Sequence, residues 1–112
     1  MSELEEEFVW QLSTILVNPA REYKAIPGRR FRWDFAIPER KLLIEIQGGT
    51  WVSNTGHSSG SGIRRDCEKI NLATLAGWRV LHFTGDMVRD GEALATVEKA
   101  MQCFYPRTEE VK

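Results

Sequence analysis

The sequence of 112 residues predicts an α/β sandwich in which helices cover one mixed β-sheet. Two observations carry this prediction. Short segments with alternating apolar residues are typical of strands, and longer segments with apolar residues every three or four positions are typical of helices. These segments follow one another as helix, three strands, helix, strand and helix. The first three strands can form an antiparallel meander, and the fourth follows a helical crossover, which is right-handed by strong preference.

Residues 2–17 are expected to form the first helix. Ser2 can cap it, and Glu5 follows three residues later in the arrangement of a capping box. An apolar stripe recurs at helical spacing, formed by Leu4, Phe8, Leu12 and Ile15. Asn18 and Pro19 are expected to end the helix.

Three strands are predicted next, over residues 21–26, 29–37 and 41–47, separated by Pro27-Gly28 and by a turn at residues 38–40. In the second strand, alternation assigns one face to Phe31, Trp33, Phe35 and Ile37, and the other face to Arg30, Arg32, Asp34 and Ala36. In the third strand, one face carries Leu42, Ile44 and Ile46, and the other carries Leu43, Glu45 and Gln47.

Residues 48–62 have the Gly, Ser, Asn and Thr composition of a flexible loop. A second helix is expected over residues 63–77, ended by Gly77. Its apolar face would be formed by Ile63, Cys67, Ile70 and Thr74. A fourth strand over residues 78–84 precedes a helical turn and a closing helix within residues 85–105.

Composition fits one globular domain spanning residues 1–112. The chain has 42% hydrophobic and 28% charged residues, which are ordinary values. We find no apolar run that would cross a membrane and no signal peptide, and we therefore expect a cytoplasmic protein. Cys67 and Cys103 lack the spacing of a zinc site and are expected to be reduced, partly buried thiols. The net charge of −1 does not favour nucleic-acid binding, but local basic clusters allow it.

Two carboxylates stand inside neighbouring apolar strands. If the turn leaves Ile37 opposite Leu42, Asp34 lies across from Glu45 with Cβ atoms roughly 5 Å apart, and Gln47 lies on the side of Glu45. Carboxylates this close repel unless one is protonated or a cation lies between them. Such oxygen ligands suit Mg²⁺ or Mn²⁺. An odd-length turn would place the carboxylates on opposite faces unless a bulge corrects it.

These residues resemble a known family. Asp34, ten residues and then Glu45-Ile46-Gln47 are similar to the PD-(D/E)XK nuclease signature, with glutamine in place of lysine. The segments KLLIEIQGGTW, DCEK and GWRVLHFTGD and the first helix resemble small phage and bacterial endonucleases related to very-short-patch-repair enzymes. The resemblance extends from Glu5 to about Leu94. It implies a restriction-endonuclease-like α-β-β-β-α-β-α sandwich.

The resemblance also implies metal-assisted hydrolysis of phosphodiester bonds, with Mg²⁺ or Mn²⁺ as the cofactor. Asp34 and Glu45 would be metal ligands, and the backbone carbonyl of Ile46 could add another. Gln47 would orient water, but it offers no cation where the family has a lysine.

Two further candidate catalytic residues lie outside the signature. Lys69 could supply the missing cation, as some related families recruit a lysine from the neighbouring helix. It could equally pair with Asp66 on the helix surface. Many family members use a glutamate of the first helix, and Glu5 fits that spacing best. Glu6 and Glu7 compete for the role, and the helix dipole alone favours acids at these positions.

The basic residues indicate a DNA-binding surface. Arg30 and Arg32 are predicted to share the face of Asp34, beside the scissile phosphate. Arg64 and Arg65 begin a helix, where the dipole also attracts phosphate. Each arginine alone could equally be a solvated charge.

Two residues of the loop at 48–62 are further DNA-binding candidates. Trp51 could stack on a base or could close the core. His57 could be a solvated or structural histidine, and the resemblance adds a role in DNA contact or proton transfer. His82, on the fourth strand, is expected to be a sheet residue with a local partner.

The leading hypothesis is a small Mg²⁺-dependent DNA endonuclease or nickase, encoded by a phage and acting in the host cytoplasm. A chain of this length would recognise DNA shape, such as a junction, mismatch or flap, or would act as a homodimer on two strands. The alternatives are a non-catalytic DNA-binding module that retains the nuclease fold, and a structural protein that binds no DNA. No nucleophile elbow, Walker loop or dinucleotide fingerprint is present.

Overall fold

The structure, a computed structural model, describes residues 2–47 and 60–103, without the side chain of Cys103. The elements are α1 (Glu3–Ser13), β1 (Ala20–Tyr23), β2 (Trp33–Ile37), the 3₁₀ turn η1 (Pro38–Arg40), β3 (Leu42–Gln47), α2 (Gly60–Leu75), β4 (Arg79–Thr84), α3 (Gly85–Arg89) and α4 (Glu92–Cys103). This is the predicted order, with α3 as the expected helical turn. Strands β1 and β2 are shorter than predicted.

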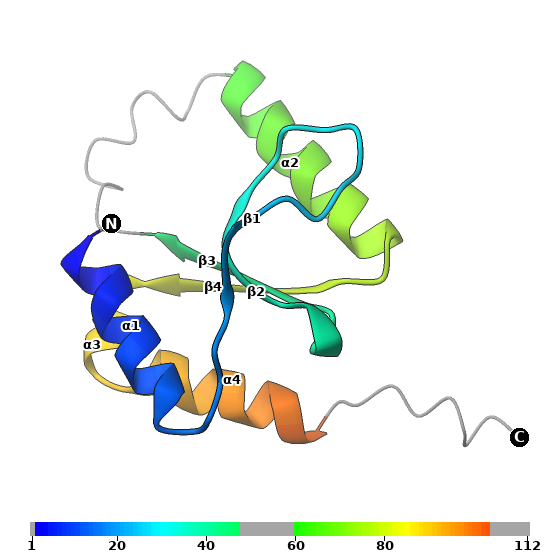
Figure 1. Ribbon diagram of the computed structural model, residues 1–112. Coiled ribbons are helices and arrows are strands. Elements are labelled where there is room, and N and C mark those ends of the chain that lie inside the picture. The colour runs from blue at the N-terminus through cyan, green and yellow to red at the C-terminus, as the bar shows by residue number, and fades with distance from the viewer. Residues whose placement is uncertain (1, 48–59, 104–112) are drawn as a thin grey trace, which may run out of the picture.

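One mixed sheet of four strands, in the order β1-β2-β3-β4, forms the middle layer. β1 and β2 are antiparallel, as are β2 and β3, whereas β3 and β4 are parallel. α2 covers one face of the sheet, and α1, α3 and α4 cover the other (Figure 1). The predicted fold class, an α/β sandwich with one mixed sheet, is confirmed.

The turn between β2 and β3 has the geometry that the carboxylate hypothesis requires. Ile37 lies opposite Leu42, and Phe35 lies opposite Ile44. Lys41 closes the turn in the left-handed region, where its amide donates to the carbonyl of Pro38. The strand faces of β3 follow the predicted alternation, because Leu42 and Ile44 belong to the core under α1 and Leu43 belongs to the core under α2.

Helix α1 begins as predicted and ends earlier. The Ser2 hydroxyl accepts a hydrogen bond from the amide of Glu5 at 3.1 Å, and Phe8 is fully buried. The helix ends at Ser13 because Leu16 takes a φ of 64°. This left-handed residue reverses the chain and returns Val17 to the core.

The predicted face of the second strand is confirmed for Phe35 and Ile37, with Ala36 on the other face, but it is wrong for Phe31 and Trp33. Phe35 packs in the core under α1, but Trp33 packs with Ala36 in the core under α2, so the alternation breaks between them. The break occurs at Asp34, where the register with β3 ends. Phe31 packs against the core under α2, and residues 29–32, predicted as the start of this strand, are not in a strand.

The predicted apolar face of the second helix is also wrong. α2 begins at Gly60 and meets the sheet through Leu72 and Ala73. The residues expected to be buried are instead exposed: Ile63, Cys67, Ile70 and Thr74. Cys67 is therefore a free, exposed thiol and not a partly buried one.

The predicted end of the second helix is confirmed. Gly77 has a φ of 91°, and its amide donates to the carbonyl of Thr74 at 3.0 Å. The next amide, of Trp78, donates to Ala73 at 2.9 Å. This pair of bonds is the Schellman motif, which turns the chain directly into β4. Across the part of the chain that the structure describes, no helix combines the length and apolar character needed to span a membrane.

Candidate active site

Asp34 and Glu45 lie where β2 and β3 separate. The last paired residues of the two strands are Phe35 and Ile44, so Asp34 and Glu45 each stand one step beyond the ladder. There, Asp34 Oδ2 accepts a hydrogen bond from the amide of Ile46 at 2.7 Å. The Asp34 carboxylate thus accepts the hydrogen bond that a backbone carbonyl would accept in a continuing ladder. This contact holds the carboxylate between the two strands.

Glu45 is the most perturbed carboxylate of the site. Burial, together with the neighbouring Asp34 charge, raises its pKa to about 6 from the ordinary 4.5, although Lys69 and the Asp34 amide favour the ionised form. Its Oε2 lies 3.5 Å from the Nζ of Lys69. Its Oε1 is buried and accepts no hydrogen bond from another described residue. A buried carboxylate oxygen without a partner is costly, and such oxygens are common at functional sites.

The acidic character extends from the sheet to α1. Burial raises the pKa of Asp34, an effect that the Ile46 amide opposes. Burial also raises the pKa of Glu5, and the charges of Asp34 and Glu22 raise it further. Of the three α1 glutamates that competed for a role, Glu5 is therefore the one on which the charge of Asp34 acts. Among described residues, Glu6 pairs with Arg21 at 3.4 Å and Glu7 accepts from Gln11.

Lys69 reaches from α2 to the same carboxylates. Its Nζ donates to the carbonyl of Arg32 at 2.7 Å and lies 4.7 Å from the ring centroid of Trp33. With 18% of its side chain exposed, Lys69 is held against the sheet. The structure thus brings Lys69 to Glu45 and not to Asp66 on the helix surface.

Gln47 contacts a residue that sequence reasoning did not assign to the site. Its Nε2 lies 3.2 Å from Nδ1 of His82. Desolvation and then the charge of Lys69 lower the pKa of His82, while Asp66 opposes the shift. A neutral His82 can accept the Gln47 amide hydrogen at Nδ1. The parallel register of β3 and β4, which aligns Glu45 with His82, brings the two side chains together, and local sequence spacing does not determine it.

Glu22 is a second residue that sequence reasoning missed. It has a φ of 50° in β1, and its charge raises the pKa of both Asp34 and Glu5. A bulky residue in the left-handed region is uncommon and marks local strain. No sequence pattern signals this conformation.

The oxygen donors at this point fit a hard divalent cation. No group of three or more His, Cys, Asp or Glu side chains that could hold a metal ion occurs among the described residues. The candidate donors are instead the carboxylates of Asp34 and Glu45, with the carbonyl of Ile46 as the third donor expected from the sequence. Because Glu45 Oε1 accepts no hydrogen bond within residues 2–47 and 60–103, it could bind such an ion. Mg²⁺ is often held by one or two carboxylates with water in the remaining positions.

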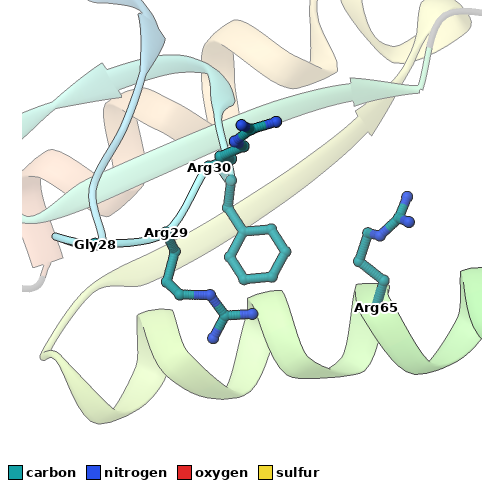
Figure 2. Close-up of a pocket in the computed structure, with 5 residues that line it drawn as sticks. Gly28, Arg29, Arg30 and Arg65 are labelled. Carbon is teal, nitrogen blue, oxygen red and sulfur yellow. The ribbon is translucent and has the colours of Figure 1, made fainter.

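The predicted DNA-binding arginines lie in different places. Arg30 and Arg65 line a pocket of about 530 Å³ (Figure 2). Arg32 lies 3.9 Å from Glu22. Arg30 and Arg32 precede β2, so the prediction that they share a strand face with Asp34 is wrong. Arg64 is exposed on α2 and does not line the pocket. Trp51 and His57 lie outside the described residues, and their roles stay predictions.

Comparisons with known proteins find a similar solved structure but no similar sequence. No family model matches the chain, and no curated protein matches its sequence. Among solved structures, the chain is similar to the catalytic domain of the homing endonuclease I-Bth0305I, with a TM-score of 0.66 and 19% sequence identity. The match covers 89% of this chain and 94% of that domain. The shared fold is that of a nuclease catalytic domain.

Proposed function

We propose that this chain is a metal-dependent DNA endonuclease or nickase, built as a single PD-(D/E)XK-like domain over residues 1–112. The observation that carries the proposal is the buried, partnerless Oε1 of Glu45 beside Asp34, at the point where β2 and β3 separate. The fold shared with a homing endonuclease catalytic domain supports it. Membership of the very-short-patch-repair-like group, a phage origin and action in the bacterial cytoplasm belong to the same proposal.

Asp34, Glu45 and the carbonyl of Ile46 are the proposed ligands of Mg²⁺ or Mn²⁺. Bound there, the ion would supply an activated water and neutralise charge on the phosphate undergoing attack. A carboxylate binds the cation in its ionised form. The cation therefore competes with the proton at Glu45, whose pKa burial raises to about 6.

Other side chains complete the site. The ammonium group of Lys69 supplies the cation that Gln47 lacks, and it can stabilise negative charge on the phosphate. The Arg32 carbonyl and the Trp33 ring hold this group in place. Gln47, fixed by His82, orients the attacking water. Glu5 adds negative charge beside Asp34.

A non-catalytic DNA-binding module is the second candidate. One contact favours it: the ion pair between Lys69 and Glu45, at 3.5 Å, balances the buried charge without a metal ion. In that case the fold would present the arginines to DNA without hydrolysing it.

Plasmid cleavage with Mg²⁺ or Mn²⁺ separates the two candidates. We expect the wild type to nick or linearise the plasmid, and Glu45→Gln to slow cleavage by about a hundredfold or more. Glu98→Gln is the matched control, because it makes the same change on an exposed residue of α4, across the sheet from α2. Equal cleavage by all three proteins contradicts the proposal, and DNA binding without cleavage by any of them supports the module.

The same assay tests Lys69. We expect Lys69→Met to slow cleavage by about tenfold or more, because charge stabilisation in the transition state is lost. DNA affinity should change much less. A wild-type cleavage rate would show that Lys69 only neutralises Glu45.

A further inference from the structure

A basic pocket adjoins the proposed active site. It is lined by Gly28, Arg29, Arg30, Phe31 and Arg65 and has a volume of about 530 Å³. Gly28, at a φ of 81°, reverses the chain before β2. Figure 2 shows Arg29 extending from this turn toward α2 and Arg65 rising from α2 beside it. The pocket thus lies between the turn and the helix.

The arginines of this pocket differ in their partners. Arg29 pairs with Glu68 at 2.8 Å, and its guanidinium lies 4.7 Å from the ring centroid of Phe31. Glu68 therefore balances the charge of Arg29, and Glu68 and the Phe31 ring together hold its planar guanidinium group in place. Arg30 and Arg65 are exposed and make no hydrogen bond or ion pair with another described residue. Their charges are available to an anion.

The pocket is one helical turn from the catalytic candidates. Arg65 stands four residues before Lys69 on α2, which corresponds to about 6 Å along the helix axis. On the side of the pocket formed by residues 28–31, Arg32 follows directly in sequence, and its backbone carbonyl accepts the hydrogen bond from Lys69 Nζ. About 6 Å is the rise of one to two nucleotides along a DNA strand. A substrate strand that runs from Glu45 along α2, toward the N-terminus of the helix, would therefore pass the pocket.

We propose that this pocket binds an unpaired nucleotide of the substrate strand. Arg30 and Arg65 bind the phosphate, and the guanidinium of Arg29, supported by Phe31, is the plane on which the base stacks. Guanidinium planes and aromatic rings are common stacking partners for unpaired bases, and the volume is in the range of small-ligand pockets. The inference rests on the proposed function and gives it a substrate class: DNA with an unpaired nucleotide within one or two positions of the cleaved bond.

Fluorescence anisotropy in EDTA tests the stacking plane. The probes are a fully paired duplex and the same duplex with one extra nucleotide. We expect the wild type to bind the bulged duplex about fivefold or more tightly, the lower end for stacking one base. Arg29→Lys keeps the charge and loses the plane, and Phe31→Leu removes its support. Both variants should bring the affinity ratio close to one without changing affinity for the paired duplex.

The salt dependence of binding tests the phosphate contacts. Arg65→Ala should weaken binding of both duplexes and lower the salt slope by about 1, the value for one lost phosphate contact. Arg89→Ala is the matched control, because it removes one exposed positive charge from α3, on the sheet face opposite α2, and should leave both affinities and the salt slope at their wild-type values.

A wild type that binds both duplexes equally, or an unchanged ratio in both Arg29→Lys and Phe31→Leu, overturns the inference. Because these measurements need no cleavage, they fail or succeed independently of the Glu45-dependent plasmid assay.

Discussion

Glu45 is a carboxylate whose ionisation opposes folding. In the folded chain its pKa is about 6, against an ordinary 4.5, chiefly because the group is buried. The folded state therefore holds the proton more tightly than the unfolded chain. This proton binding stabilises the folded state below about pH 4.5, and the stabilisation is lost as the pH rises through about 6. At neutral pH the loss lowers the free energy of unfolding by about 2 kcal/mol. A position that sacrifices stability in this way is typical of a functional site.

The substitution Glu45→Gln removes this ionisation. We expect the free energy of unfolding to rise by about 2 kcal/mol at about pH 8 without divalent ions, and to change little at about pH 4.5. Denaturant unfolding at the two pH values measures the difference. If the variant is instead less stable at the higher pH, the ion pair with Lys69 outweighs the burial cost.

Sequence reasoning found the residues whose position depends on local spacing. The turn that aligns Ile37 with Leu42 puts Asp34 and Glu45 at the same level of the sheet, and both follow from counting residues. The contact between Gln47 and His82 depends instead on the parallel register of β3 and β4. That register is set across a helix and a loop, so local spacing does not determine it.

At the scale of elements, periodicity identified each helix and strand but not always its buried face. β3 pairs with β4 along its whole length, from Leu42 to Gln47, and its alternation is as predicted. The ladder between β2 and β3 ends at Asp34, because the Asp34 carboxylate accepts the hydrogen bond of the Ile46 amide. The alternation of side chains along β2 fails at the same residue. On α2, the apolar stripe predicted from spacing is exposed, because the face turned to the sheet carries Lys69 and small or medium side chains.

Gly77 determines where α2 ends and β4 begins. We expect Gly77→Ala to lower the free energy of unfolding by about 1–2 kcal/mol, the cost of a left-handed conformation for an L-residue. A Cβ there meets only Lys41 Cε at 3.7 Å, so the cost is one of backbone conformation.

Gly60→Ala is the control for Gly77→Ala, since a Cβ at Gly60 meets no atom of the described residues within 4 Å and lies in a helix. It should leave stability unchanged or raise it slightly. Thermal unfolding measures both variants. Equal stability of the two would contradict the account of the helix end.

At the scale of the whole molecule, the site draws on all three layers of the sandwich. Asp34 and Glu45 come from the sheet, Lys69 comes from α2, and Glu5 comes from α1 on the opposite face (Figure 1). Lys69 pairs with Glu45, and the charge of Asp34 acts on Glu5, so groups from both sides of the sheet act on this pair of carboxylates.

The central claim is that Asp34 and Glu45 bind one divalent ion together. Calorimetric titration with Mn²⁺ tests it directly. We expect saturable binding at one site in the wild type and in Glu98→Gln, and affinity weakened by about tenfold or more in both Asp34→Asn and Glu45→Gln. Wild-type protein that binds no Mn²⁺, or binding that survives both substitutions at the carboxylates, would contradict the account.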